Sequence, residues 1–202
     1  LEWAFERGQR GLFFPDQHLG RNTAVNMGIG LGEMPLWNPA RPLGNNDEQT
    51  LRDARVILWQ GFCSVHKRFT PAQIDKARAE HPDVRVIVHP ECPRETVEAA
   101  DEAGSTAYIT KAIEQATAPT TFAIGTEINL AQRLAAEHPQ HEIFCLVICP
   151  CSTMYRIHPG YIAWVLESLI DGQVVNQISV DAEVAEPARL SLERMLAAKP
   201  RI

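Results

Sequence analysis

Short apolar runs rich in β-branched and aromatic residues recur along the chain, and longer stretches of mixed polarity separate them. Runs of this length and composition, bounded by turn-forming residues, are typical of buried strands. The predicted strands are GLFF (11–14), RVILW (55–59), VRVIV (84–88), TFAIG (121–125) and EIFCLVI (142–148). Buried strands of this kind are expected in a mostly parallel sheet.

The stretches between the strands carry helix start and stop signals. Thr70 and Gln73 form a capping box around Pro71 at the first helical position. Gly104 and Gly172 stand where helices would end. The predicted helices are PAQIDKARAE (71–80), PRETVEAADEAG (93–104), EINLAQRLAAE (127–137), PGYIAWVLESLIDG (159–172) and ARLSLERML (188–196). This alternation predicts the α/β class, with helices on both faces of parallel sheets.

Two stretches of the chain resemble each other. ARAEHPDVRVIVHPE (77–91) and LAAEHPQHEIFCLVICP (134–150) both have a helix ending in Ala-Glu-His-Pro, then a strand. The similarity indicates duplicated α/β units rather than one continuous sheet. Residues 28–46, rich in Gly, Pro and Asn, are predicted to be an ordered surface loop.

Composition narrows the class of protein. The chain has 202 residues, of which 45% are hydrophobic, enough for one large or two small domains. A net charge of −6 argues against a nucleic-acid or membrane-surface partner. Five cysteines, an odd number without a secretory signal, favour a reducing cytoplasm. In that compartment clustered cysteines are more often metal ligands or catalytic residues than disulfide partners.

Candidate chemistry follows the predicted strands. Ligands of parallel α/β sheets bind outside the carboxyl ends of the strands. The residues found there are Asp16, His18, Cys63, His66, His89, Glu91, Thr126, Glu127, Cys149 and Cys151. Asp16 and Thr126 could simply cap helices, but capping does not explain the histidines and cysteines. Cys149 and Cys151 could be core residues, a redox pair or metal ligands.

Several motifs resemble those of quinolinate synthase, the iron–sulfur enzyme of de novo NAD biosynthesis. In order along the chain they are FFPDQHLGRNTA, WNPARPLG, VILWQGFCSVHKRF, VHPECP, AGSTAYI, IGTE and CPCSTMYRIHP. The resemblance implies α/β/α domains with short parallel sheets, three of them around a pseudo-threefold axis in the family and two in this chain. The expected division is 1–64 and 65–150 as the second and third family domains, with 151–202 as a C-terminal segment that carries a cluster ligand.

The resemblance also implies an activity. The family transferase condenses iminoaspartate with dihydroxyacetone phosphate to quinolinate, with a [4Fe–4S] cluster that three cysteines hold and whose fourth iron is open to substrate. Its partners would be these two small-molecule substrates, and L-aspartate oxidase would be a neighbour in the pathway. Neither nucleic acid nor a membrane is expected as a partner. A cytoplasmic location is expected.

The site residues follow from matching the family motifs. Cys63, in GFCSVH, matches one cluster ligand, and Cys151, three residues before Met154, matches another and is preferred to Cys149. The resemblance assigns acid–base chemistry and substrate binding to His66, His89 and Glu91, with Glu91 as general base, and further substrate binding to Ser105 and Thr106. Thiolates and carboxylates suit these roles.

Some family motifs have no counterpart here, namely the first cluster cysteine, a Tyr-x-Asn segment and a Cys-Thr-Ser-Ser-Asn-Ala segment. The chain is therefore expected to lack the first domain and to be inactive alone. One rival hypothesis is a non-catalytic iron–sulfur or redox-sensing module. Another is a mononuclear zinc enzyme that uses Cys63, His66 and His89. Cys92 and Cys145 are interpreted as structural, because free cysteine is commonly buried.

Overall fold

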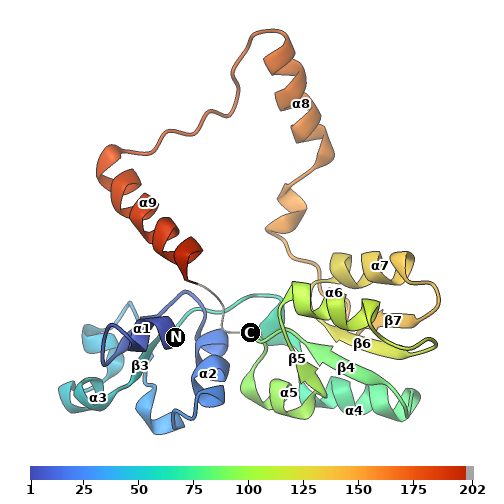
Figure 1. Cartoon of the computed structure of the whole chain (residues 1–202), viewed down its shortest axis with the longest axis horizontal. Helices are drawn as coiled ribbons and strands as arrows, with labels where there is room; N and C mark the ends of the chain where they lie inside the picture. The colour runs from blue at the N-terminus through green and yellow to red at the C-terminus, as the bar shows by residue number, and fades with distance from the viewer. Residues whose placement is uncertain (199–202) are drawn as a thin grey trace. The chain divides into compact units, whose positions relative to one another are not determined.

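The computed structural model describes residues 1–198. The chain separates into two compact units, one of Leu1–Cys151 and one that begins at Ser152. Figure 1 shows that the strands belong to the first unit, while the second is helical. The predicted segment 151–202 therefore lies almost entirely in the second unit, and its last four residues are outside the described part of the chain.

The first unit begins with a three-stranded parallel sheet of order β1-β3-β2. Its strands and the helices around them are β1 (Gly11–Phe13), β2 (Leu36–Trp37), β3 (Val56–Trp59), α1 (Glu2–Phe5), α2 (Gln17–Asn26) and α3 (Glu48–Asp53). Val56 and Leu58 of β3 are fully buried and pack with Ala24 of α2. This small core holds α2 against β3.

The predicted loop 28–46 contains a strand that the sequence pattern did not indicate. Leu36 and Trp37 form β2, which pairs with the end of β3, and two 3₁₀ turns flank it. A strand of two residues shows no periodicity, which explains the wrong prediction. Gly44 has a positive φ of 64°, and a Cβ there would lie 2.5 Å from the Trp37 ring.

A second parallel sheet has the order β5-β4-β6-β7. Its strands are β4 (Arg85–Val88), β5 (Glu102–Ala103), β6 (Thr121–Gly125) and β7 (Glu142–Cys145). Its helices are α4 (Pro71–Glu80), α5 (Arg94–Ala99), α6 (Thr106–Glu114) and α7 (Ile128–Glu137). The capping box of α4 is confirmed, with Gln73 Oε1 accepting from the Thr70 amide at 3.0 Å.

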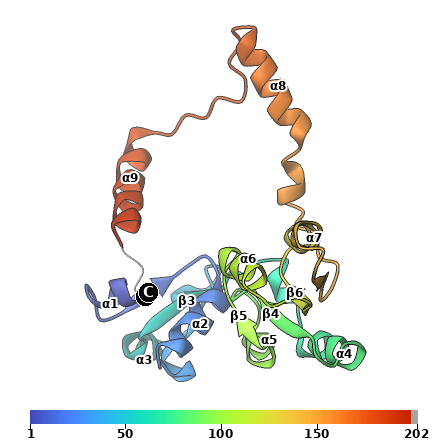
Figure 2. The same cartoon turned by 45° about the vertical axis from the view of Figure 1, so that its right-hand side comes forward.

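Alternate residues of β4 enter two different cores. Val86 and Val88 pack with α4 and α5, whereas Ile87 packs with α6 and α7. Figures 1 and 2 show these helix pairs on opposite faces of the sheet. The α/β prediction is confirmed, and the second sheet has the expected three layers.

Two predicted elements end earlier than the sequence suggested. The helix predicted over 93–104 ends at Ala99, and the chain then forms β5 before Gly104. Gly104 is therefore no helix cap. A Cβ there would lie 2.1 Å from the Tyr108 ring, so glycine permits close packing against α6. Strand β7 ends at Cys145, three residues before the end of its apolar run.

The second unit contains α8 (Pro159–Ile170) and α9 (Ala182–Ala197). Gly172 has a φ of 74°, and its amide bonds to the Leu169 carbonyl, which confirms the predicted end of α8. The predicted helix 188–196 lies within α9. Neither these nor the other helices over residues 1–198 are long and apolar enough to cross a membrane.

Candidate functional site

Three loops meet at the carboxyl ends of the parallel strands. Cys63 and His66 follow β3, His89 and Glu91 follow β4, and Thr126 follows β6. Because β4 and β6 are paired, their ends are adjacent, and the His89 amide donates to the Gly125 carbonyl at 3.0 Å. Strand pairing therefore brings together residues that are far apart in sequence.

His66 is the centre of this group. Its Nδ1 lies 2.8 Å from Glu91 Oε2, and its Nε2 lies 3.0 Å from the Thr126 hydroxyl. The ring stacks on His89, with centroids 4.2 Å apart. When Nδ1 carries the proton and donates to the Glu91 carboxylate, Nε2 of the neutral ring accepts from the Thr126 hydroxyl. Both nitrogens are thus engaged, and the buried ring is fixed in orientation.

The electrostatics of Glu91 and His89 follow from this arrangement. The hydrogen bond from His66 lowers the pKa of Glu91, which keeps its carboxylate ionised at neutral pH. Burial, and then the nearby His66, lowers the pKa of His89 from 6.5 to about 4. At neutral pH the site therefore holds one ionised carboxylate beside a neutral imidazole.

The pKa of His89 gives a prediction for the metal-free protein. Its NMR titration should have a midpoint near pH 4 instead of 6.5. Between these values the unfolded chain binds more protons than the folded one, so the free energy of unfolding should fall as the pH drops through this window. His89→Asn should flatten that dependence. A midpoint near 6.5 would contradict the buried stacked arrangement.

Cys63 and Cys151 lie near each other. Both are half-buried and pack against one core cluster, and the charge of Cys151 acts on Cys63. Burial raises the pKa of the Cys63 thiol, while the amides of His66 and Val65 lower it by hydrogen bonding to the sulfur. Amide donors directed at a sulfur also suit a thiolate that binds metal.

Two of the other three cysteines are more enclosed, while Cys145 is half-buried. Cys149 is fully buried, with its Sγ 3.6 Å from the Val65 carbonyl oxygen and 3.7 Å from the Arg68 guanidinium. Cys92 is also fully buried, and burial raises the pKa of its thiol. Cys145 ends β7, packs against both cores of the second sheet and donates to the Thr126 carbonyl at 3.4 Å. Their surroundings are those of structural cysteines.

The side chains of Cys63, His66 and Glu91 could hold a metal ion. One ligand atom from each lies within 4.8 Å of the others. Thiolate, imidazole and carboxylate are ligands of divalent metals such as zinc. The zinc hypothesis used His89 as the third ligand, whereas this group contains Glu91.

Ser105 and Thr106 lie after β5, next to the end of β4. Both are exposed. Ser105 is the N-cap of α6, and its hydroxyl accepts from the Tyr108 amide at 3.2 Å. These residues share the carboxyl edge with His89 and present a helix N-terminus there, which is suited to an anionic group.

Sequence reasoning missed the roles of several residues around the site. Asp16 was a strand-end candidate with a helix cap as the alternative; it does cap α2, and its carboxylate also accepts from the Cys63 amide. Thr126 caps no helix; its neighbour Glu127 caps α7. Buried Asn22 donates to the carbonyls of Pro90 and Cys92 and thereby ties α2 to the loop after β4. Asp16, Thr126 and Glu127 could have been found as polar residues that follow a strand, whereas Asn22 lies within α2 and carried no such signal.

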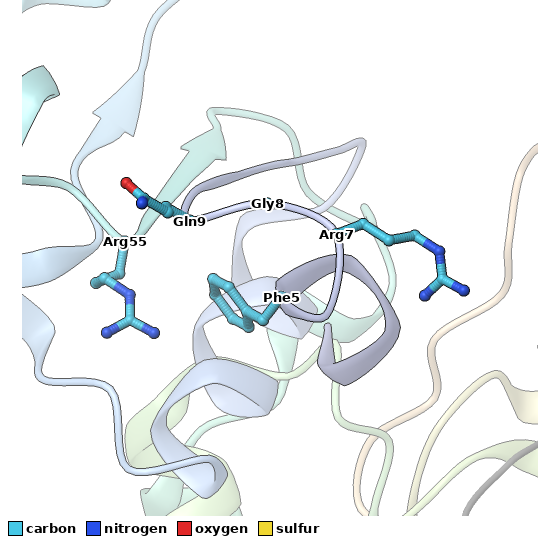
Figure 3. A pocket seen from close by; sticks show the side chains of 5 residues that line it. All are labelled: Phe5, Arg7, Gly8, Gln9 and Arg55. Atoms are coloured by element: carbon cyan, nitrogen blue, oxygen red, sulfur yellow. The ribbon is translucent and has the colours of Figure 1, made fainter.

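A pocket near the start of the chain is lined by residue types that differ from those at the strand ends. It has a volume of about 650 Å³ and is lined by Phe5, Arg7, Gly8, Gln9 and Arg55. Figure 3 shows the Arg7 side chain pointing away from Phe5 and Arg55. Its five described lining residues include two arginines but no thiol, imidazole or carboxylate, so the strand ends remain the candidate site.

Fold and site define a parallel α/β protein with side chains at its strand ends that could hold a metal ion. The model of the family described as "Quinolinate synthetase A protein" matches residues 1–197, and the chain belongs to this family. It is 70% identical over 202 residues to the quinolinate synthase of Corynebacterium glutamicum, covering 99% of this chain and 51% of that protein. It is 52% identical over 202 residues to that of Rhodopirellula baltica, covering 98% and 52%. The chain thus spans about half the length of these curated relatives.

Proposed function

We propose that this chain is part of a quinolinate synthase that condenses iminoaspartate with dihydroxyacetone phosphate. The convergence of Cys63, His66 and Glu91 at the strand ends carries the proposal, in a chain that is 70% identical to a protein of that name. Domains at 1–64 and 65–150 are part of the proposal, and the two separate parallel sheets support them. A cytoplasmic location, with L-aspartate oxidase as a pathway neighbour, also belongs to it.

The proposed cofactor is a [4Fe–4S] cluster, and part of the donor set fits it. Cys63 and Cys151 are neighbouring half-buried thiols, and amide groups face the Cys63 sulfur. These two residues would hold the cluster from this chain, with further ligation from outside residues 1–202. When bound, an open iron supplies Lewis-acid activation of substrate oxygens.

Glu91 is the proposed general base. Its carboxylate is ionised and oriented by His66, and the reaction requires removal of a proton beside a carbonyl group. A base must have its accepting oxygen fixed within hydrogen-bonding reach of the proton that it removes. Since both nitrogens of His66 are engaged, the structure supports an orienting role for this ring.

Neutral His89 and the α6 N-terminus are the proposed substrate-binding groups. His89 can donate to or accept from a substrate oxygen without carrying a charge. Thr106 is exposed at the start of α6, and a helix N-terminus suits a carboxylate or phosphate.

The test is made with the full-length protein that contains residues 1–202. After anaerobic reconstitution with ferrous iron and sulfide, we expect a brown protein that forms quinolinate from both substrates. Cys63→Ala should lose both properties. A brown protein without turnover would instead support the redox-sensing module. A colourless zinc protein that needs Cys63, His66 and Glu91 would support a mononuclear enzyme in which Glu91 takes the place expected for His89.

A further inference from the structure

Two buried carboxylates bond to the backbone of the two candidate cysteine ligands. Asp16 Oδ2 accepts from the Cys63 amide at 2.8 Å. Glu127 Oε1 accepts from the Cys151 amide at 3.3 Å. Asp16 is only 5% exposed and Glu127 only 7%, so water does not compete freely for either carboxylate. The same contact thus occurs twice, in different parts of the fold.

Each carboxylate also starts a helix. The other oxygen of Asp16 accepts from the Leu19 amide at 2.8 Å and caps α2. The other oxygen of Glu127 accepts from the Asn129 amide at 2.7 Å and caps α7. Both helices are ten residues long and pack against the buried sheets. Each cysteine is therefore tied through one side chain to a rigid helix.

We propose that Asp16 and Glu127 are positioning residues that hold Cys63 and Cys151 in the geometry required for joint metal ligation. The inference deepens the proposed function and rests on it for the nature of the bound group. Residues that orient metal ligands typically change metal affinity by 10–100-fold when they are replaced. The two carboxylates do not touch the reacting atoms; they act through the cysteines.

The proposal predicts a crossed pattern of thiol reactivity in the metal-free full-length protein. Asp16→Ala should speed alkylation of Cys63 by iodoacetamide roughly tenfold and leave Cys151 unchanged, because a lost backbone anchor promotes local opening. Glu127→Ala should instead speed alkylation of Cys151 and leave Cys63 unchanged. Mass spectrometry of the two peptides measures both rates independently of metal binding.

Asp47→Ala is the matched control. Asp47 caps α3 through the Thr50 amide at 2.7 Å but is exposed and belongs to a different helix from those tied to the cysteines. Its replacement should alter neither alkylation rate. If Asp16→Ala or Glu127→Ala fails to fold, Asp16→Asn and Glu127→Gln keep the side-chain volume, and each should give the same crossed pattern with a smaller change.

A second readout concerns the proposed cluster. Asp16→Asn removes a negative charge near a ligand and should therefore raise the reduction potential of the cluster. Asp47→Ala removes only a helix cap and should leave the potential of the cluster unchanged. Equal alkylation rates in all variants, or equal acceleration of both cysteines by each, would overturn the positioning role. If wild-type protein holds no iron but the crossed pattern appears, the proposed cofactor fails while the positioning role stands.

Discussion

Replacing Glu91 with glutamine in the full-length protein is expected to lower turnover by roughly 10²-fold or more, while iron content stays unchanged. Glutamine has nearly the same shape and keeps an oxygen that can accept from His66 Nδ1, which lies 2.8 Å from Glu91 Oε2. What it loses is the ionised oxygen that takes a proton in the proposed mechanism. The loss should appear in kcat rather than in substrate binding.

Glu98→Gln is the control for this prediction. Glu98 lies on α5 near Glu91 in sequence, is exposed and pairs with Arg94 four residues before it. Its replacement should leave turnover within about twofold, since exposed ion pairs of this kind contribute little. Full activity of Glu91→Gln would remove Glu91 from the mechanism. Loss of the metal would mean that Glu91 is a ligand, as in the group of Cys63, His66 and Glu91.

The sequence predicted the framework of the site because that framework depends on local patterns. β3, β4 and β6 are compact apolar runs, and each is followed at once by polar residues. Parallel pairing then places their carboxyl ends together. The sequence did not predict α6, since Gly104 was interpreted as the end of the preceding helix rather than as the link between β5 and a new one.

The contacts that orient the site could not be predicted in the same way. Asp16 and Cys63 are 47 positions apart, and Glu127 and Cys151 are 24 apart. Hydrogen bonds of this range depend on how two loops are placed by their strands, and no local propensity encodes them. The contacts of His66 with both Glu91 and Thr126 likewise arise only after β3, β4 and β6 are in place. The sequence identifies the residues of the site, but it does not show which residues they bond to in the folded chain.

Residues 1–202 produced by themselves are expected to form no quinolinate and to hold little iron. The proposed cluster would need three thiolates, and the family motifs match two half-buried neighbours in this chain, Cys63 and Cys151. Cys149 and Cys92 are fully buried, so either would have to leave its core position to bind metal. Ligation by two thiolates leaves the cluster weakly held.

Exposed apolar side chains on α8 support a second part of this prediction. Large apolar residues are exposed along this helix from Tyr161 to Ile170, and Ile170 is 84% exposed. Large exposed apolar patches favour association. The isolated chain should therefore form oligomers as its concentration rises, which size-exclusion chromatography with light scattering would detect.

The decisive measurement compares residues 1–202 alone with the same residues mixed with the part of the Corynebacterium glutamicum relative that they do not match. After anaerobic reconstitution, iron, sulfide and quinolinate should rise together only in the mixture, because the third thiolate would then be supplied. A Cys63→Ala chain in the same mixture should stay inactive, which controls for activity of the added part. Full activity of residues 1–202 alone would show that Cys92 or Cys149 serves as the third ligand, and that the buried positions of these two sulfurs open when the metal binds.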